Sequence, residues 1–173
     1  SIRGDYTEVV AGKKTTKNKL RQLTKSDIVF REDDIYNERL YAIQWIKDDN
    51  STRPATEFRS VTEDDLVRER KVTAFMQEHL ADWQAHGFTP DTMIEKGDET
   101  ERLYKERGWT HWHHLFNPRQ LLLLGLLKKY GGADTVLQFC SVVNRGSKLC
   151  QWEHGSSKPQ AVFYNQALNT FFN

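Results

Sequence analysis

The stretch from Gly108 to Tyr130, GWTHWHHLFNPRQLLLLGLLKKY, constrains the fold of this chain more than any other. It starts as a cluster of aromatic and histidine residues and continues directly into a predicted helix. Asn117 suits the N-cap of that helix, because its side-chain oxygen can accept a backbone N–H of the first turn. Pro118 suits the first helical position, where its missing N–H costs no hydrogen bond. The sequence therefore predicts a helix that begins at a fixed point.

The body of this predicted helix is apolar on nearly every side. Leucines fill six of the seven positions from Leu121 onwards, and two lysines follow before Gly131 and Gly132 end the helix. A helix without a polar face is typical of a protein core. The apolar run is about half the roughly 20 residues that a bilayer requires, so it predicts no membrane span. We expect a central core helix with Leu123 and Leu124 both inside.

The N-terminal third predicts a small antiparallel sheet. Residues 39–47 (RLYAIQWIK) alternate in character and are rich in aromatic and β-branched side chains, which is typical of a strand. Turn-forming residues 48–51 follow, and residues 55–61 (ATEFRSV) would return as the second strand of a hairpin. Two strands alone are marginally stable. We therefore expect a third strand near Tyr6 or over residues 28–30, with a helix beneath the sheet.

The rest of the chain predicts helices. Thr62 and the three acids after it form a helix start, and apolar residues at helical spacing continue to Gly87. Further helical patterns cover residues 99–107, 134–150 and 160–172. The apolar side of the second of these contains Val136, Leu137, Cys140 and Val143. The predicted fold class is thus α+β, a small antiparallel β-sheet packed on a mainly α-helical bundle.

Length and charge divide the chain further. A chain of 173 residues has the size of one domain, which we place at residues 28–173, with a hairpin region (28–61) and a helical region (62–173). Residues 1–27 are rich in lysine and predict a basic flexible arm or linker. Residues 1–31 carry eight Lys and Arg against three Asp and Glu, and residues 107–173 carry seven against two. This uneven distribution of charge along the chain indicates a surface that binds nucleic acid or a partner, or simply charged faces exposed to solvent.

The cysteines and the ends of the chain suggest where the protein works. Two cysteines are too few for a disulfide framework, and no signal peptide or membrane-spanning run is visible. We therefore expect a cytoplasmic protein with no membrane partner. The first residue is not methionine and the last four, Thr170–Asn173, are abruptly apolar, which suggests a piece of a longer polypeptide.

The histidine cluster raises the possibility of a metal site. His111 and His113, with Cys150 and His154 further along the chain, are candidate zinc ligands. No Cys-x-x-Cys pair accompanies them, so buried or capping histidines are the favoured interpretation. The acids after Thr62 suit the helix dipole better than acid–base catalysis, and no Gly-rich phosphate loop occurs. We therefore predict no catalytic residue, no metal site and no cofactor for this chain itself.

Three basic or polar clusters are candidates for contact with DNA. Lysines of the arm would meet phosphates, which gives affinity without sequence information. Polar residues in the first turn of the central helix suit a phosphate or a base edge, and a tryptophan beside cations suits base stacking. For Arg119 an ion pair with the acidic middle of the chain is the favoured alternative. The full set is Lys13, Lys14, Lys17, Arg119, Gln120, Arg145, Lys148 and Trp152.

Several stretches also resemble, in order, landmarks of a known family. They are FREDDIYNERLYAIQW (30–45), FRSVTEDDL (58–66), GWTHWHHLFNPRQLLLLGLL (108–127), NRGSKLCQW (144–152) and FYNQAL (163–168). The family comprises the large bacterial and archaeal adenine-specific DNA methyltransferases that contain a zinc ribbon and are often found beside phage-defence genes. Its LF-x-PRQLL signature resembles residues 115–122, with Asn117 where threonine is usual, and either residue caps a helix.

This resemblance implies a non-catalytic role. Members of the family bind S-adenosylmethionine through a Gly-rich motif, hold the target adenine with an Asp/Asn-Pro-Pro-Tyr motif, and carry a Cys-rich zinc ribbon. This chain has none of the three, since its four prolines are never adjacent and its cysteines number two. The resemblance thus implies the segment between those motifs of a restriction-modification or phage-defence enzyme. This segment would be inactive alone. It would bind DNA and take part in target recognition, or it would support the catalytic domain among the remaining domains of the parent polypeptide.

The alternative function is a structural or protein–protein interaction module with no direct contact to DNA. Such a module would expose a large apolar patch, and the expected place for it is around Trp109, Trp112 and the Phe171–Phe172 end. Binding of duplex DNA distinguishes the two functions.

Overall fold

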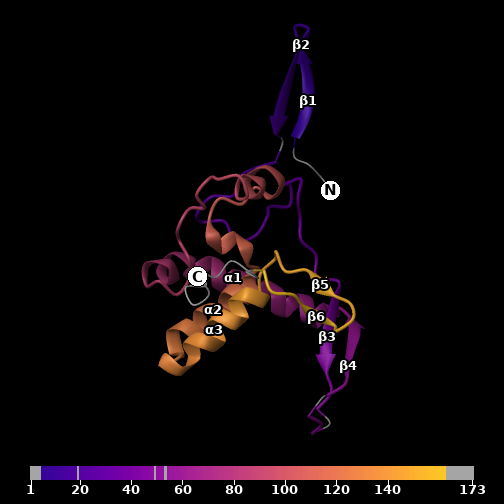
Figure 1. Ribbon diagram of the computed structural model, residues 1–173, viewed down its shortest axis with the longest axis vertical. Coiled ribbons are helices and arrows are strands. Elements are labelled where there is room, and N and C mark those ends of the chain that lie inside the picture. The colour runs from indigo at the N-terminus through magenta and orange to yellow at the C-terminus, as the bar shows by residue number, and fades with distance from the viewer. Residues whose placement is uncertain (1–4, 19, 49, 53, 163–173) are drawn as a thin grey trace, which may run out of the picture.

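The computed structural model describes residues 5–18, 20–48, 50–52 and 54–162. Within these residues three α-helices and three two-stranded ribbons confirm the α+β class (Figure 1). The helices are α1 (Glu63–Ala85), α2 (Pro118–Tyr130) and α3 (Val136–Arg145), with a π-helical turn η1 (Leu103–Arg107) and 3₁₀ turns η2 (Trp112–Leu115) and η3 (Ala133–Thr135). The strands are β1 (Asp5–Val10), β2 (Lys13–Asn18), β3 (Ala42–Ile46), β4 (Thr56–Ser60), β5 (Trp152–Glu153) and β6 (Lys158–Pro159).

The strands pair only with their neighbours in the chain. The predicted hairpin is confirmed, because β3 and β4 lie within residues 39–47 and 55–61 and pair antiparallel. The expected third strand is wrong: the strand near Tyr6 pairs with β2, and residues 28–30 lie in no strand. The β5–β6 ribbon lies beside β3–β4 instead (Figure 1), where Gln44 Nε2 donates to the Ser157 carbonyl at 3.3 Å.

The basic N-terminal stretch is more ordered than expected. Ala11 and Gly12 have φ values of 52° and 76°, as a two-residue turn with positive φ at both positions requires. The twist of such a turn matches that of the strands it joins, so β1 and β2 form a ribbon that projects away from the helices (Figure 1). Behind the ribbon, Leu20 and Leu23 are buried in the body of the protein. Residues 13–18 thus form a strand, and Leu20 and Leu23 anchor the stretch that follows it in the core.

Helix α1 forms one wall of the core. Its predicted start is confirmed, since Thr62 and Asp65 form a reciprocal capping box, and the chain leaves the helix at Gly87 with φ of 70°. Its inward face packs with the cluster that fills the protein. The buried members of this cluster are Leu23, Ile28, Phe30, Met76, Leu80, Trp83, Ile94, Tyr104, Trp109, Leu115, Phe116, Leu121 and Leu124.

Helix α2 begins as the sequence predicts. The Asn117 side chain accepts the backbone N–H of Gln120 at 2.9 Å, and the Gln120 side chain accepts that of Asn117 at the same distance. A Cβ atom on Gly125 would lie 2.2 Å from the Trp83 ring of α1. Glycine at this position therefore permits the close approach of α2 to α1, which brings the start of α2 beside the first half of α1.

The expectation that α2 is buried on all sides is wrong. Leu124 is only 6% exposed, but Leu123 is 51% exposed, and Leu126 and Tyr130 are also at the surface. Neighbouring elements cover part of the circumference of this helix, and the remaining stripe faces outward. No helix in the described part of the chain is both long and apolar enough to cross a membrane.

Helix α3 turns toward the core a face that shares only Val143 with the expected one. Phe139, Val142 and Val143 pack against the core, whereas Val136 and Leu137 are exposed, as is Cys140. The apolar face of this short helix is wide, and neighbouring elements cover only the part of it that contains Phe139, Val142 and Val143. The final helix expected over residues 160–172 falls almost wholly outside the described residues, and Lys158–Pro159, just before it, form β6.

The two adjacent leucines of α2 test this packing directly. Leu124→Ala removes a buried side chain and should lower the free energy of unfolding by about 2–5 kcal/mol. Leu123→Ala, a matched control one residue away, should cost less than about 1 kcal/mol because its side chain is half exposed. Urea unfolding midpoints measure both changes. Equal losses in the two variants would contradict the observed orientation of α2.

Candidate nucleic-acid interface

The histidine cluster fastens an earlier part of the chain to the core. His114 Nδ1 accepts the backbone N–H groups of Thr110 and His111 at 3.1 and 3.2 Å. Its Nε2 lies 3.1 Å from the Thr24 carbonyl. Because Nδ1 accepts, Nε2 carries the proton and donates it to Thr24. A neutral imidazole thus joins two segments that are far apart in sequence.

His113 makes a second link of the same kind. Its Nε2 donates to the Asp27 carbonyl at 3.0 Å, while its Nδ1 lies 3.5 Å from the Gln84 amide nitrogen. Both histidine rings are fully buried. Burial disfavours the charged imidazolium and lowers the pKa of His113 to about 4 and that of His114 to about 3. Both side chains are therefore neutral at physiological pH.

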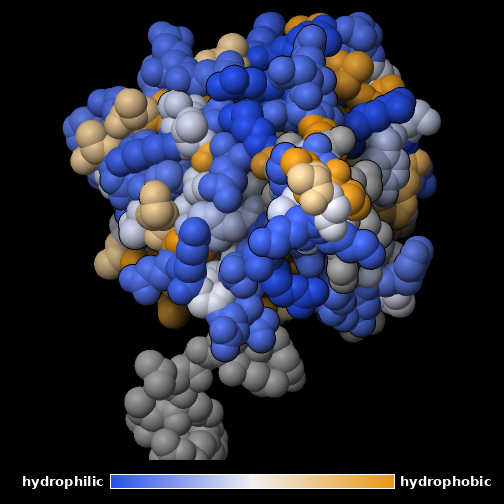
Figure 2. Space-filling model, turned by 90° about the horizontal axis from the view of Figure 1, so that it is seen from above, coloured by the Kyte–Doolittle hydropathy of each residue, from blue (hydrophilic) through white to orange (hydrophobic). Residues whose placement is uncertain are grey.

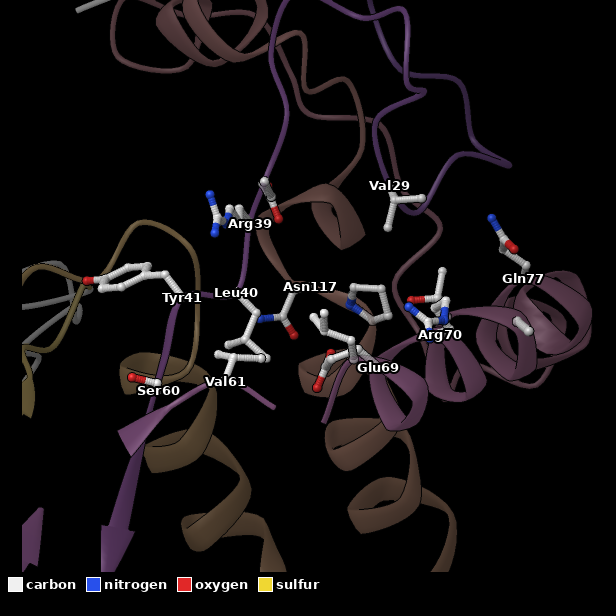
Figure 3. Close-up of a pocket in the computed structure, with 15 residues that line it drawn as sticks. Val29, Arg39, Leu40, Tyr41, Ser60, Val61, Glu69, Arg70, Gln77 and Asn117 are labelled. Atoms are coloured by element: carbon white, nitrogen blue, oxygen red, sulfur yellow. The ribbon is translucent and has the colours of Figure 1, made fainter. Parts of the chain in front are cut away.

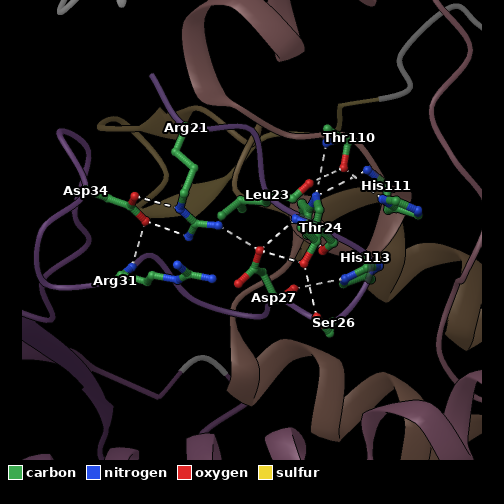
Figure 4. A network of polar contacts seen from close by, with 11 residues as sticks. Arg21, Leu23, Thr24, Ser26, Asp27, Arg31, Asp34, Thr110, His111 and His113 are labelled. Atoms are coloured by element: carbon green, nitrogen blue, oxygen red, sulfur yellow. Dashed lines mark hydrogen bonds and ion pairs between the residues drawn. The ribbon is translucent and has the colours of Figure 1, made fainter. Parts of the chain in front are cut away.

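The loop that receives these bonds is itself held by charge (Figure 4). The Arg21 guanidinium donates to both carboxylate oxygens of Asp34 at 2.7 Å and to Asp27 at 2.8 Å. The bonds from Arg21 lower the pKa of Asp34. For Asp27, burial opposes ionisation, but hydrogen bonds from Thr24 and Arg21 outweigh it and lower the pKa. We call this set the histidine clamp: Arg21, Thr24, Asp27, Asp34, His113 and His114.

The four candidate metal ligands are not gathered into a site. His111 Nδ1 lies 2.8 Å from the Thr110 hydroxyl, and both nitrogens of His113 have hydrogen-bond partners. The Cys150 thiol donates to the Asn144 carbonyl at 3.6 Å, and His154 is exposed in the β5–β6 turn. Within the described ranges, no group of three or more His, Cys, Asp or Glu side chains is placed to hold a metal ion.

The polar start of α2 is occupied by contacts within the protein. Arg119 forms an ion pair with Glu69 of α1, which confirms its favoured pairing with the acidic middle of the chain. The Arg119 side chain is half exposed, so the pair lies at the surface rather than in a buried site. Gln120 serves the capping box of its own helix. Both side chains therefore already have a structural partner within the protein.

The C-terminal candidates separate into buried and exposed ones. Lys148 pairs with Glu38 at 2.9 Å and lies 5.0 Å from the centre of the Trp109 ring, and burial lowers its pKa. This lysine joins two parts of the body, and its ammonium is not displayed to solvent as a DNA contact would require. Arg145 is exposed at the end of α3. Trp152 is 44% exposed and packs edge-on against Phe58 at 5.8 Å.

The lysines of β2 lie at the surface, on the ribbon that projects from the body. Lys13, Lys14 and Lys17 are exposed on the projecting ribbon, and Lys17 pairs with Glu8 of β1. Lys13 and Lys14, which follow the turn, form no ion pair with any described residue. Figure 2 views the molecule from this end, where hydrophilic residues predominate and apolar ones lie in small separate groups.

An open groove of about 890 Å³ runs between the start of β3, the end of β4 and the helices α1 and α2 (Figure 3). Leu40 and Val61 line it together with the apolar side of α1. Of its charged residues, Glu69 pairs with Arg119 and Arg70 pairs with Glu63. Glu38 pairs with Lys148, and the lining contains no histidine or cysteine that could serve as a base or nucleophile.

Two features escaped the sequence interpretation. Arg21 and Asp34 of the histidine clamp lie 13 residues apart with no pattern that links them. The second feature is the exposure of Tyr41 and Trp45. The alternating pattern predicts that they are alternate residues of a strand, but it does not predict which face of that strand is covered. In the structure both are exposed.

Comparison with known proteins adds no further identification. The chain matches no family model, no curated protein and no solved structure. The resemblance to adenine-specific DNA methyltransferases therefore rests on the residues quoted for it.

The clamp predicts a specific dependence of stability on pH. His113 and His114 hold protons more weakly in the folded chain than in the unfolded chain, where the pKa is about 6.5. The unfolded state therefore gains protons first as the pH falls, and the free energy of unfolding should decrease from about pH 6.5 toward about pH 4. The stability that these neutral histidines give is complete above pH 6.5. Urea unfolding at pH 7, 6, 5 and 4.5 measures the slope.

Substitutions assign that slope to the clamp. His114→Gln should be less stable at pH 7 but should lose less additional stability between pH 6.5 and 4.5. His154→Gln changes an exposed histidine and should leave both quantities as they are in the parent chain. An unchanged slope in His114→Gln would refute the assignment.

Two arginine substitutions distinguish the clamp from the surface. Arg21→Ala leaves Asp27 and Asp34 without their partner in a largely buried setting and should cost on the order of 3 kcal/mol. Arg119→Ala breaks a solvent-exposed pair and should cost at most about 1 kcal/mol. Thermal and urea unfolding of both variants provide the comparison. A larger loss for Arg119→Ala would mean that the capped start of α2, not the clamp, fixes the fold.

Proposed function

We propose that this chain is a non-catalytic segment of an S-adenosylmethionine-dependent, adenine-specific DNA methyltransferase and that it contributes contacts to DNA. The ordered landmarks between residues 30 and 168 support the family assignment. The absence of a Gly-rich cofactor motif and of adjacent prolines from the sequence supports a role outside the reaction centre.

The residues that carry the resemblance contribute to this function as a frame. In the stretch 108–127, Trp109, Leu115 and Phe116 are buried in the core, and Asn117 and Gln120 cap α2. His113 and His114 hold the loop that leads back to the β1–β2 ribbon. The landmark stretch therefore serves to hold other elements in position. The DNA contacts are expected on those other elements rather than on the stretch itself.

The observation that carries the proposal is the β1–β2 ribbon. It projects from the body, it is two strands wide, and its second strand carries exposed Lys13, Lys14 and Lys17. The major groove of B-DNA admits a two-stranded ribbon. Lysine ammonium groups that meet backbone phosphates release counterions and supply affinity that does not depend on sequence. Such a ribbon would contribute affinity and position, while target choice rests with other contacts.

The test is a double substitution on the ribbon. Lys13→Ala/Lys14→Ala should weaken binding to a fluorescent 20-base-pair duplex and reduce the slope of log affinity against log salt by about two, since each phosphate contact contributes about 0.9. The melting temperature should not change, because both side chains are exposed. Fluorescence anisotropy between 50 and 200 mM salt (on the order of the range over which such contacts weaken) measures the slope.

A matched control removes the same charge elsewhere. Lys71→Ala/Lys128→Ala takes two exposed lysines from α1 and α2 and should leave the salt slope as it is. If both double variants change the slope equally, affinity follows net charge and the ribbon has no special role. If the parent chain binds no duplex at all, the proposed DNA contact is refuted.

One observation favours the alternative, a protein-interaction module. Leu123, Leu126 and Tyr130 recur at helical spacing along the open side of α2, and Leu137 of α3 is exposed as well. Of the patch expected from the sequence, Trp109 is buried, Trp112 is partly buried against the core, and Phe171–Phe172 lie outside the described residues. A segment that meets the remaining domains of its parent enzyme would use such a stripe, so this surface is compatible with either function.

A further inference from the structure

The β3–β4 ribbon has two faces of different character. Its register pairs Ile43 with Arg59 and Trp45 with Glu57. Because side chains directly opposite each other in an antiparallel ribbon share a face, these four residues lie on one side. Gln44 and its partner Phe58 lie on the other.

The two faces differ in what covers them. Phe58 packs edge-on against Trp152 of β5, and Gln44 donates to the Ser157 carbonyl in the β5–β6 turn. The β5–β6 ribbon thus lies against the Gln44 face. Trp45, on the opposite face, remains 45% exposed. Tyr41 directly precedes β3, four positions before Trp45, and its side chain is 81% exposed at the edge of the groove of Figure 3.

The open face combines aromatic rings with positive charge. The Arg59 guanidinium lies 5.2 Å from the centre of the Trp45 ring, and Lys47 follows Trp45 at the next position of the same parity. Arg39 precedes Tyr41 in the same way and is exposed. The acidic partner on this face is Glu57, which pairs with Arg59 and with Lys47 at 3.6 Å. Three cations against one carboxylate leave a net positive surface around two exposed rings.

Spacing selects the kind of ligand that such a surface fits. Residues at every second position of a strand lie about 6.5 Å apart, so Tyr41 and Trp45 are separated by about 13 Å. Bases stacked in a duplex follow one another at about 3.4 Å and their faces are covered by neighbouring bases. Rings this far apart can each stack on a base only if the bases are unstacked and the strand is extended. A single strand meets that condition, and its phosphates match the cations of this face.

We propose that the Tyr41–Trp45 face of β3, with Arg39, Lys47 and Arg59 around it, binds single-stranded DNA by stacking its rings on the bases. This inference rests on the proposed function and deepens it, because it specifies that a second surface of the protein binds DNA in its single-stranded form. The lysine ribbon β1–β2 binds duplex, and the aromatic face holds a strand that has left the duplex.

The experiment compares two tryptophans of equal exposure. The probe is a 12-residue oligothymidylate, which forms no duplex, and affinity is measured by anisotropy at fixed salt. Trp45→Ala and Tyr41→Ala should each weaken binding about 5- to 100-fold, as the loss of one base–aromatic stack does. Trp152→Ala, on the covered side, removes a ring that is 44% exposed and should change the affinity less than about twofold. Trp45→Phe should retain most of the affinity because it keeps a stacking ring.

Two further measurements separate this inference from the proposed function. Circular dichroism melts test whether each variant is folded. If Trp45→Ala does not fold, Tyr41→Ala, which alters the most exposed ring, still tests the proposal. The duplex affinity of Trp45→Ala should equal that of the parent chain. Binding of duplex without binding of oligothymidylate would overturn this inference and leave the proposed function standing. Oligothymidylate binding that Trp45→Ala and Tyr41→Ala do not alter, or that Trp152→Ala weakens equally, would overturn it too.

Discussion

The structure depends on hydrogen bonds that two uncharged imidazoles make in the core. His113 and His114 each donate from Nε2 to a backbone carbonyl of the loop between Thr24 and Asp27. That loop contains little regular structure, and its carbonyls would be costly to bury without donors. The histidines supply the donors, and Arg21 with its two aspartates fixes the loop in the geometry that receives them. Removal of water from the rings keeps them neutral, which is the form that can both donate and accept.

This clamp explains how a small protein presents its surfaces. Residues 20–34 follow the β1–β2 ribbon in the chain and lead from it into the core. The clamp holds this stretch against η2. The β3–β4 ribbon leaves the same body further along the chain, beside the first half of α1 and the groove of Figure 3. The exposed lysines of β2 and the exposed Trp45 of β3 lie on these two ribbons, so the frame and the proposed DNA surfaces are different parts of the molecule.

Local interactions allowed much of the fold to be predicted. The capping boxes at Thr62 and Asn117 and the left-handed glycines Gly87 and Gly108 involve residues within four positions of one another, so sequence alone predicted the helix starts and ends. The β3–β4 hairpin followed from alternation and from the turn chemistry between its strands. The candidate site was less predictable. Arg119 pairs with Glu69 and Lys148 with Glu38, partners 50 and 110 residues distant, and these pairings decide that neither cation is free.

The sequence by itself determined where α1, α2 and the β3–β4 hairpin begin, and that a leucine-rich helix follows a histidine cluster. Only the tertiary structure decided which side of each element faces inward. Leu123 and Leu124 are chemically the same, and their exposures differ because Gly125 lets α1 approach one side of α2. Both faces of β3 carry apolar residues, so its periodicity fits two orientations equally, and the apolar face of α3 is wider than the surface that covers it. The physical reason is that helix caps and turns are local hydrogen bonds, whereas the choice of a buried face depends on which distant segment supplies the covering surface.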